Sequence, residues 1–127
     1  MKLLRALSMV AVLGSATLAS ADEKREEVSQ ADAEKFLGFF NKFVDAVVGN
    51  KDACPKMATS VNTVIDQHLD VLRAANAARE AKKKLPKSYE DKMMARVKEM
   101  MPAMQKCGTD KDVQAAIGRM DKKDPAK

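Results

Sequence analysis

The chain contains a single histidine, His68, and this residue is the best candidate for chemistry in the sequence. Apolar residues recur at helical spacing on both sides of it, so we expect His68 on the inner face of a long helix. A later predicted helix carries a similar stripe of methionines. If these two helices pack together, His68 faces Met93, Met100 and Met101. Imidazole and thioether ligands suit copper(I), and a histidine with a methionine can also hold haem iron in a helical bundle.

The same residues have a plainer interpretation, in which they only fill a core. Methionines at helical spacing usually occupy irregular gaps between packed helices. The sequence has no second histidine and no Cys-x-x-Cys-His motif for covalent haem attachment. We therefore assign no cofactor, and a copper-type metal site stays open as the alternative to a core histidine.

Five basic residues form a second candidate site in the stretch that follows the histidine helix. They are Arg79, Lys82, Lys83, Lys84 and Lys87. Such a cluster could bind an anionic surface, such as phospholipid headgroups, or an acidic protein, and it could equally be a solvated loop between helices. No aromatic residue is interleaved with the lysines, which argues against binding of single-stranded nucleic acid.

The first 21 residues have the organisation of a cleavable secretory signal. Lys2 and Arg5 precede an apolar segment too short to span a bilayer, and small residues precede a cleavage site between Ala21 and Asp22. We expect an exported protein, periplasmic or secreted, with no transmembrane segment after cleavage. Removing Lys2 and Arg5 from the 23 basic residues leaves 21 against 18 acidic residues. The resulting net charge of +3 is small for a dedicated nucleic-acid-binding protein.

Export also bears on the two cysteines, Cys54 and Cys107. In an oxidising compartment an even number of cysteines favours a disulfide, and two cysteines allow only one pairing within the chain. Their wide separation does not match the Cys-x-x-Cys spacing of a redox site. We expect a structural bridge between them.

No catalytic motif is recognisable in the sequence. It lacks a glycine-rich phosphate loop and a His-Glu-x-x-His pair, and its serines and acidic residues cannot be assigned to one site with the histidine. Most acidic residues fit helix caps or surface pairs with lysine. We expect a protein that is not an enzyme.

The elements that must position these residues are helices. Only 5 glycines and 4 prolines interrupt the chain, and no strand-like alternation occurs. The prediction is an all-α fold, a small antiparallel bundle of three main helices and a short C-terminal helix over residues 29–120. Residues 22–28 are expected to be flexible, and residues 121–127 to form a disordered charged tail. The second and third helices should form an antiparallel hairpin, with the disulfide closing its open end.

Capping boxes mark the expected helix starts. Ser29 with Asp32 opens the first helix, and Ser88 with Asp91 opens the third. The apolar stripe of the first helix contains Phe36, Phe40, Phe43, Val44 and Val47. Phe39 lies at the edge of this stripe, so the helix either packs on two neighbours or exposes that ring.

In layout, an exported helical domain with one long-range disulfide resembles the small periplasmic acid-stress chaperones. A methionine-rich helical hairpin is similar to the stress chaperones linked to metal response. The chain has no tryptophan and no Leu-Thr-x-x-Gln motif, so we assign it to neither family. The resemblance implies a non-catalytic protein-binding, chaperone-like or structural module. The alternative is a bundle that binds a metal or a small ligand around His68 and the methionine face.

Overall fold

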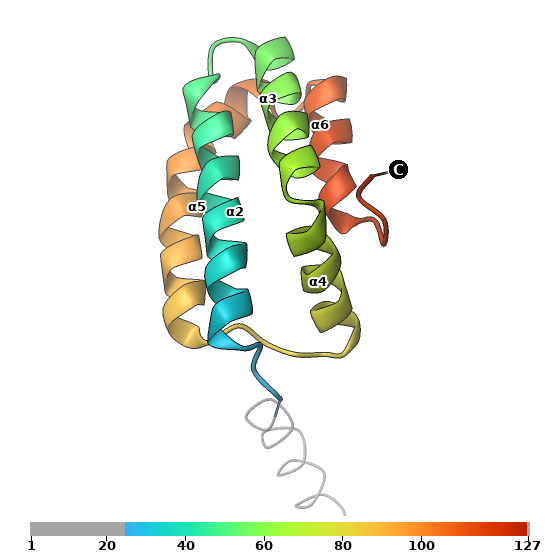
Figure 1. Ribbon diagram of the computed structural model, residues 1–127. Helices are drawn as coiled ribbons and strands as arrows, with labels where there is room; N and C mark the ends of the chain where they lie inside the picture. The colour runs from blue at the N-terminus through green and yellow to red at the C-terminus, as the bar shows by residue number, and fades with distance from the viewer. Residues whose placement is uncertain (1–24, 127) are drawn as a thin grey trace, which may run out of the picture.

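The structure, a computed structural model, describes residues 25–126 (Figure 1). Its regular elements are the helices α2 (Gln30–Gly49), α3 (Cys54–Gln67), α4 (Leu69–Glu80), α5 (Lys87–Cys107) and α6 (Lys111–Gly118), followed by a 3-10 turn (Arg119–Asp121). Within the described residues the one strand-like pairing is an isolated bridge between Glu27 and Lys84. The all-α prediction is confirmed. The expected signal peptide, its cleavage site and residues 22–24 lie outside the described residues.

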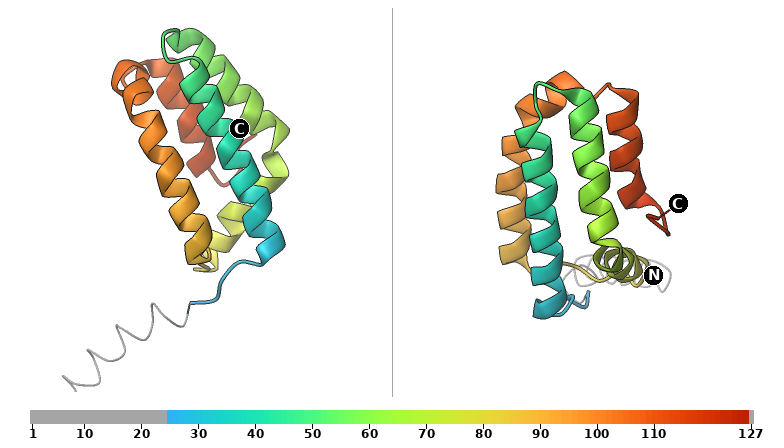
Figure 2. Two further views of the ribbon diagram at one scale, coloured as in Figure 1. Left: turned by 90° about the vertical axis from the view of Figure 1, so that its left-hand side faces the viewer. Right: turned by 45° about the horizontal axis from the view of Figure 1, so that its top comes forward.

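Helix α2 lies at the centre of the fold. The two views of Figure 2 agree with Figure 1 in placing α2 beside α5 and beside α3, and α6 covers the other side of α3. Phe39 is therefore covered and only 1% exposed, because α2 packs on two neighbours. This outcome is the first of the two alternatives that the position of Phe39 allowed.

Ser29 caps α2 as the sequence predicts, since its hydroxyl accepts a hydrogen bond of 3.2 Å from the main-chain N–H of Asp32. The second predicted cap differs, because α5 begins after Pro86 and leaves Ser88 exposed within the first turn.

We expect Ser29→Ala to destabilise the fold by about 1 kcal/mol, a fall in Tm of roughly 4–8 °C. Ser88→Ala is the matched control and should leave Tm unchanged; equal effects in thermal denaturation would contradict this assignment of the caps.

The long helix on which the sequence places His68 is broken at this residue. The main-chain N–H of His68 bonds to the Ile65 carbonyl at 3.0 Å instead of the Val64 carbonyl that a continuous helix would use. The imidazole Nδ1 lies 2.7 Å from the Val64 carbonyl oxygen, which can only accept, so Nδ1 carries the proton and donates it. The side chain of His68 thus replaces its own main chain as donor, which separates α3 from α4.

Helix α5 packs on α2, which corrects the predicted hairpin between the second and third helices. Tyr89 donates to Glu34 at 3.4 Å and Arg96 donates to the Asn41 carbonyl at 3.4 Å, so the contacts advance along both helices together. Helices α2 and α5 are therefore parallel neighbours. The physical reason is the connection between α4 and α5, residues 81–86, which we call the strap. The four residues after Lys82 can span up to about 13 Å, more than the roughly 8–10 Å between the axes of packed helices, so the chain can pass the end of α2.

The predicted disulfide between Cys54 and Cys107 is confirmed, with 5.4 Å between their Cα atoms. It joins the start of α3 to the end of α5 (Figure 1), two helices that point in opposite directions. A hydrogen bond of 2.8 Å from Lys106 to Asp52 lies next to it and lowers the pKa of the Asp52 carboxyl. The bridge ties together helices that lie on different sides of α2.

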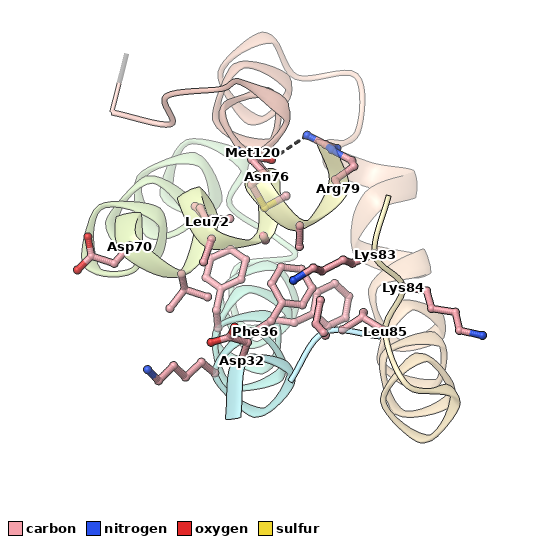
Figure 3. A pocket seen from close by; sticks show the side chains of 18 of the residues that line it. Asp32, Phe36, Asp70, Leu72, Asn76, Arg79, Lys83, Lys84, Leu85 and Met120 are labelled. Atoms are coloured by element: carbon pink, nitrogen blue, oxygen red, sulfur yellow. Dashed lines mark hydrogen bonds between the residues drawn. The ribbon is translucent and has the colours of Figure 1, made fainter. Parts of the chain in front are cut away.

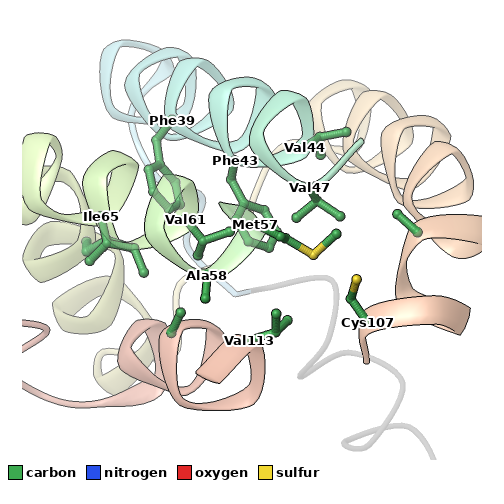
Figure 4. Close-up of a cluster of buried hydrophobic side chains, with 13 residues drawn as sticks. Phe39, Phe43, Val44, Val47, Met57, Ala58, Val61, Ile65, Cys107 and Val113 are labelled. Carbon is green, nitrogen blue, oxygen red and sulfur yellow. The ribbon is translucent and has the colours of Figure 1, made fainter. Parts of the chain in front are cut away.

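The hydrophobic core lies where α2, α3 and α6 meet (Figure 4). Its fully buried side chains include Phe39, Val44, Val47, Met57, Val61, Ile65, Cys107 and Val113. Residues 121–126 belong to this packed body as well, although the sequence predicted a disordered tail over residues 121–127, of which Lys127 lies outside the described residues. Pro125 is buried, and its carbonyl accepts a 2.9 Å hydrogen bond from Arg119, which also bonds to Asn62 on α3.

No helix between residues 25 and 126 combines the length and the apolar character that crossing a bilayer requires.

Candidate functional site

A cavity of about 780 Å³ lies between the first half of α2, helix α4 and the strap (Figure 3). Three phenylalanines of α2, Phe36, Phe39 and Phe40, form one wall. The facing wall comes from α4 and the strap, with Val28 and Met120 closing the sides. The apolar residues that α4 and the strap contribute to this wall are Val71, Leu72, Ala74, Ala75, Ala78 and Leu85. The break at His68 helps to form this site, because it allows α4 to run in a different direction from α3.

The strap is held in place by the residues that precede α2. The N–H of Val28 donates to the Lys84 carbonyl, and the N–H of Lys84 donates to the Glu26 carbonyl, both at 2.9 Å. Arg25 adds a 2.9 Å bond from its guanidinium to the Lys82 carbonyl. Residues 25–28, which the sequence placed in a flexible segment, are thus paired with the strap and help to enclose the cavity.

The polar groups on the α4 side of the cavity form hydrogen bonds with one another and with the C-terminal segment. Arg79 donates to the Asn76 side-chain oxygen at 2.7 Å and lies 3.5 Å from the Asp121 carboxylate. The amide nitrogen of Asn76 donates to the Lys122 carbonyl at 2.7 Å. Asn76 is buried and its amide is satisfied on both sides. These bonds fix the end of α4 to the C-terminal segment and engage both ends of the Asn76 amide.

The five basic residues singled out in the sequence divide into two groups. Arg79, Lys83 and Lys84 line the cavity, whereas Lys82 and Lys87 do not. Lys82 has a positive φ of 58°, so the chain turns sharply at that residue before it runs across the end of α2. The basic residues therefore do not form one continuous solvated cluster, because Lys83 and Lys84 are half-buried at the cavity.

The four candidate metal ligands do not share one helix interface. The ring of His68 lies 5.5 Å from the ring of Phe39, at the junction of α3 and α4. Met93, Met100 and Met101 are on α5, whose main neighbour is α2. Met100 packs against the core, while Met101 is 56% exposed. Within residues 25–126 no group of three or more His, Cys, Asp or Glu side chains gathers as a metal site would require.

Sequence reasoning did not find this cavity. Its walls come from segments that lie far apart in the chain, so no local pattern marks it. One available signal was the surplus of aromatic rings on the first helix, since Phe36, Phe39 and Phe40 are more than a single helix interface needs. Phe36 and Phe40 are half-buried because the cavity, and not another helix, lies against them.

No protein-family model, no curated protein sequence and no solved structure matches this chain.

Proposed function

We propose that this protein is an exported, non-catalytic binding protein that holds a small apolar molecule in the cavity between α2, α4 and the strap. The observation that carries the proposal is the cavity itself, about 780 Å³ and walled by three phenylalanines and aliphatic side chains. Ligand sites in proteins have volumes of about 300–1,000 Å³ and mainly apolar walls. Protein interiors are otherwise packed with few voids.

The residues that line the cavity support binding without catalysis. Among those described there is no serine, threonine, cysteine, tyrosine or histidine, so the wall offers no hydroxyl, thiol or imidazole nucleophile. His68 stands behind Phe39 and uses its Nδ1 within the helix junction. Export of the protein is supported by the signal-like first 21 residues together with a disulfide in the folded domain.

The cavity is stronger evidence for ligand binding than the exposed apolar side chains are for a chaperone-like role. Phe39, the ring that could have served such a surface, is buried. The large apolar side chains that are exposed in the described part of the chain are Val48, Met94 and Met101. Single exposed apolar residues are normal on soluble domains. We therefore place ligand binding ahead of protein binding.

Binding of the neutral dye N-phenyl-1-naphthylamine tests this proposal, because its fluorescence rises in an apolar site. We expect saturable binding to the purified protein and a loss of affinity of at least about tenfold in Ala75→Trp, whose indole would fill the cavity. Ala77→Trp is the matched control, since Ala77 is exposed on the same helix and does not line the cavity. It should bind the dye as the unchanged protein does.

Thermal denaturation of both variants accompanies the dye measurement. If Ala75→Trp lowers Tm by more than about 10 °C, Ala78→Leu on the same wall replaces it, because a smaller side chain strains the packing less. Dye affinity that is equal in the folded cavity variant and in Ala77→Trp would overturn the proposal. So would the absence of saturable binding to the unchanged protein.

A further inference from the structure

We propose that the ligand is an amphipathic anion with a single alkyl chain, whose acidic head pairs with Lys83 while its chain lies along the phenylalanines of α2. This inference rests on the proposed function and names the class of molecule that the cavity takes.

The charges of the cavity wall differ in burial. Lys83 and Lys84 are half-buried, whereas the other charged lining residues are exposed, namely Arg25, Asp32, Lys35, Asp70, Arg79, Glu90 and Asp121. In Figure 3 the side chain of Lys83 points into the cavity toward the aromatic wall, and that of Lys84 points away from it. A lysine at an apolar surface normally directs its ammonium group toward water. Lys83 therefore places a positive charge where a bound molecule would meet it.

Lys83 has no protein partner for that charge in the described part of the chain. No carboxylate among residues 25–126 forms an ion pair with its ammonium group. A charge that is partly removed from water and unpaired is costly, and an anionic ligand would offset this cost. The strap supplies the support, because residues 26 and 28 pair with the main chain of Lys84 and the Arg25 guanidinium bonds to the Lys82 carbonyl, so the main chain is held on both sides of Lys83.

The acidic residues of the wall leave this position open to an anion. Asp121 is engaged by Arg79, and the side chain of Asp70 is fully exposed and lies 3.8 Å from Arg73. Asp32 stands in the first turn of α2, where the helix dipole favours its charge. Glu90 is exposed on α5. The carboxylates thus lie at the rim, and the half-buried charges of the wall are both positive.

The rest of the wall selects an alkyl chain over a polar molecule. Asn76 is the one uncharged lining residue, among those described, with a polar side chain, and both ends of its amide are already bonded. A sugar, a nucleotide or a peptide would bury hydroxyl or amide groups here without partners, at a cost in affinity. An unbranched chain needs only the apolar surface that the phenylalanines, Val71, Leu72 and Leu85 provide.

Displacement of N-phenyl-1-naphthylamine by decanoate and by decan-1-ol separates the head group from the chain. We expect decanoate to displace the dye from the unchanged protein at about tenfold lower concentration than the alcohol, as a charge-assisted hydrogen bond in a partly buried site would give. Lys83→Gln should remove this preference and still bind the neutral dye. Lys82→Gln, which makes the same charge change one residue away and outside the cavity, should keep the preference.

The outcomes distinguish this inference from the proposed function. Dye binding with equal displacement by decanoate and decan-1-ol would overturn the anionic head and leave the cavity as a site for apolar molecules. Equal losses in Lys82→Gln and Lys83→Gln would show a general effect of surface charge and would also overturn the inference. Binding to phosphatidylglycerol vesicles that depends on Lys82 and Lys87 as much as on Lys83 would assign the strap to a membrane surface and contradict a single bound molecule.

Discussion

Replacing Cys54 and Cys107 together by alanine should lower the free energy of unfolding by about 4 kcal/mol, because the bridge closes a loop of many residues in the unfolded chain. The two cysteines are separated by 53 positions, and the loop contains α3, α4, the strap and α5. The bridge also joins helices that lie on different sides of α2, so no direct helix packing replaces it. For a domain of this size we expect Tm to fall by about 15–30 °C.

Urea denaturation of the alanine variant and of the reduced, otherwise unchanged protein measures this effect. Alanine is preferred to serine because Cys107 is fully buried and alanine adds no polar group to the core. The reduced protein should unfold near the midpoint of the variant, since both have lost the same bridge. A decrease below about 1 kcal/mol would contradict the structural role of the disulfide, since removing a native bridge from a small domain typically costs 2–5 kcal/mol.

Phe39→Ala should destabilise the fold by about 3–5 kcal/mol, the usual cost of deleting a buried aromatic side chain. The ring is 1% exposed and lies within 5.9 Å of the Phe36 ring and 5.5 Å of the His68 ring, measured between centroids. It supports the junction of α3 and α4 from the α2 side. Its loss therefore removes core packing and the support of the cavity wall together.

Phe36→Ala is the matched comparison, because Phe36 lines the same cavity and is only half-buried. The free energy of unfolding should fall by less than half as much in this variant, since the removed ring was already partly in contact with solvent. Equal costs for the two substitutions in urea denaturation would mean that Phe39 does not anchor the helix junction.

The sequence predicts the local features of this fold well because they depend on neighbouring residues. The Ser29 cap, the all-helical class and the Cys54–Cys107 pair follow from spacing, chemistry and the expected compartment. The partner of α5 does not follow from its own periodicity. An apolar stripe shows which face of a helix is covered and not which helix covers it. The choice of α2 over α3 and α4 depends on how the strap crosses the end of α2.

The candidate site was hidden for the same reason. The run of lysines in the sequence does not show which side chain points into a cavity. The direction of the Lys83 side chain depends on the turn at Lys82 and on the pairing of Lys84 with Glu26 and Val28. The break at His68 was also missed, because its residues continue the apolar stripe on both sides. The imidazole bond to Val64 that causes this break is a contact of one side chain and has no counterpart in periodicity.

The most direct test of the cavity as a ligand site is NMR spectroscopy of the protein labelled at its methionine methyl groups and titrated with decanoate. Met120 lines the cavity, whereas Met94 and Met101 are exposed on α5. We expect the Met120 signal to shift and saturate while the signals of Met94 and Met101 stay in place. Shifts at Met94 and Met101 with an unchanged Met120 signal would contradict the account.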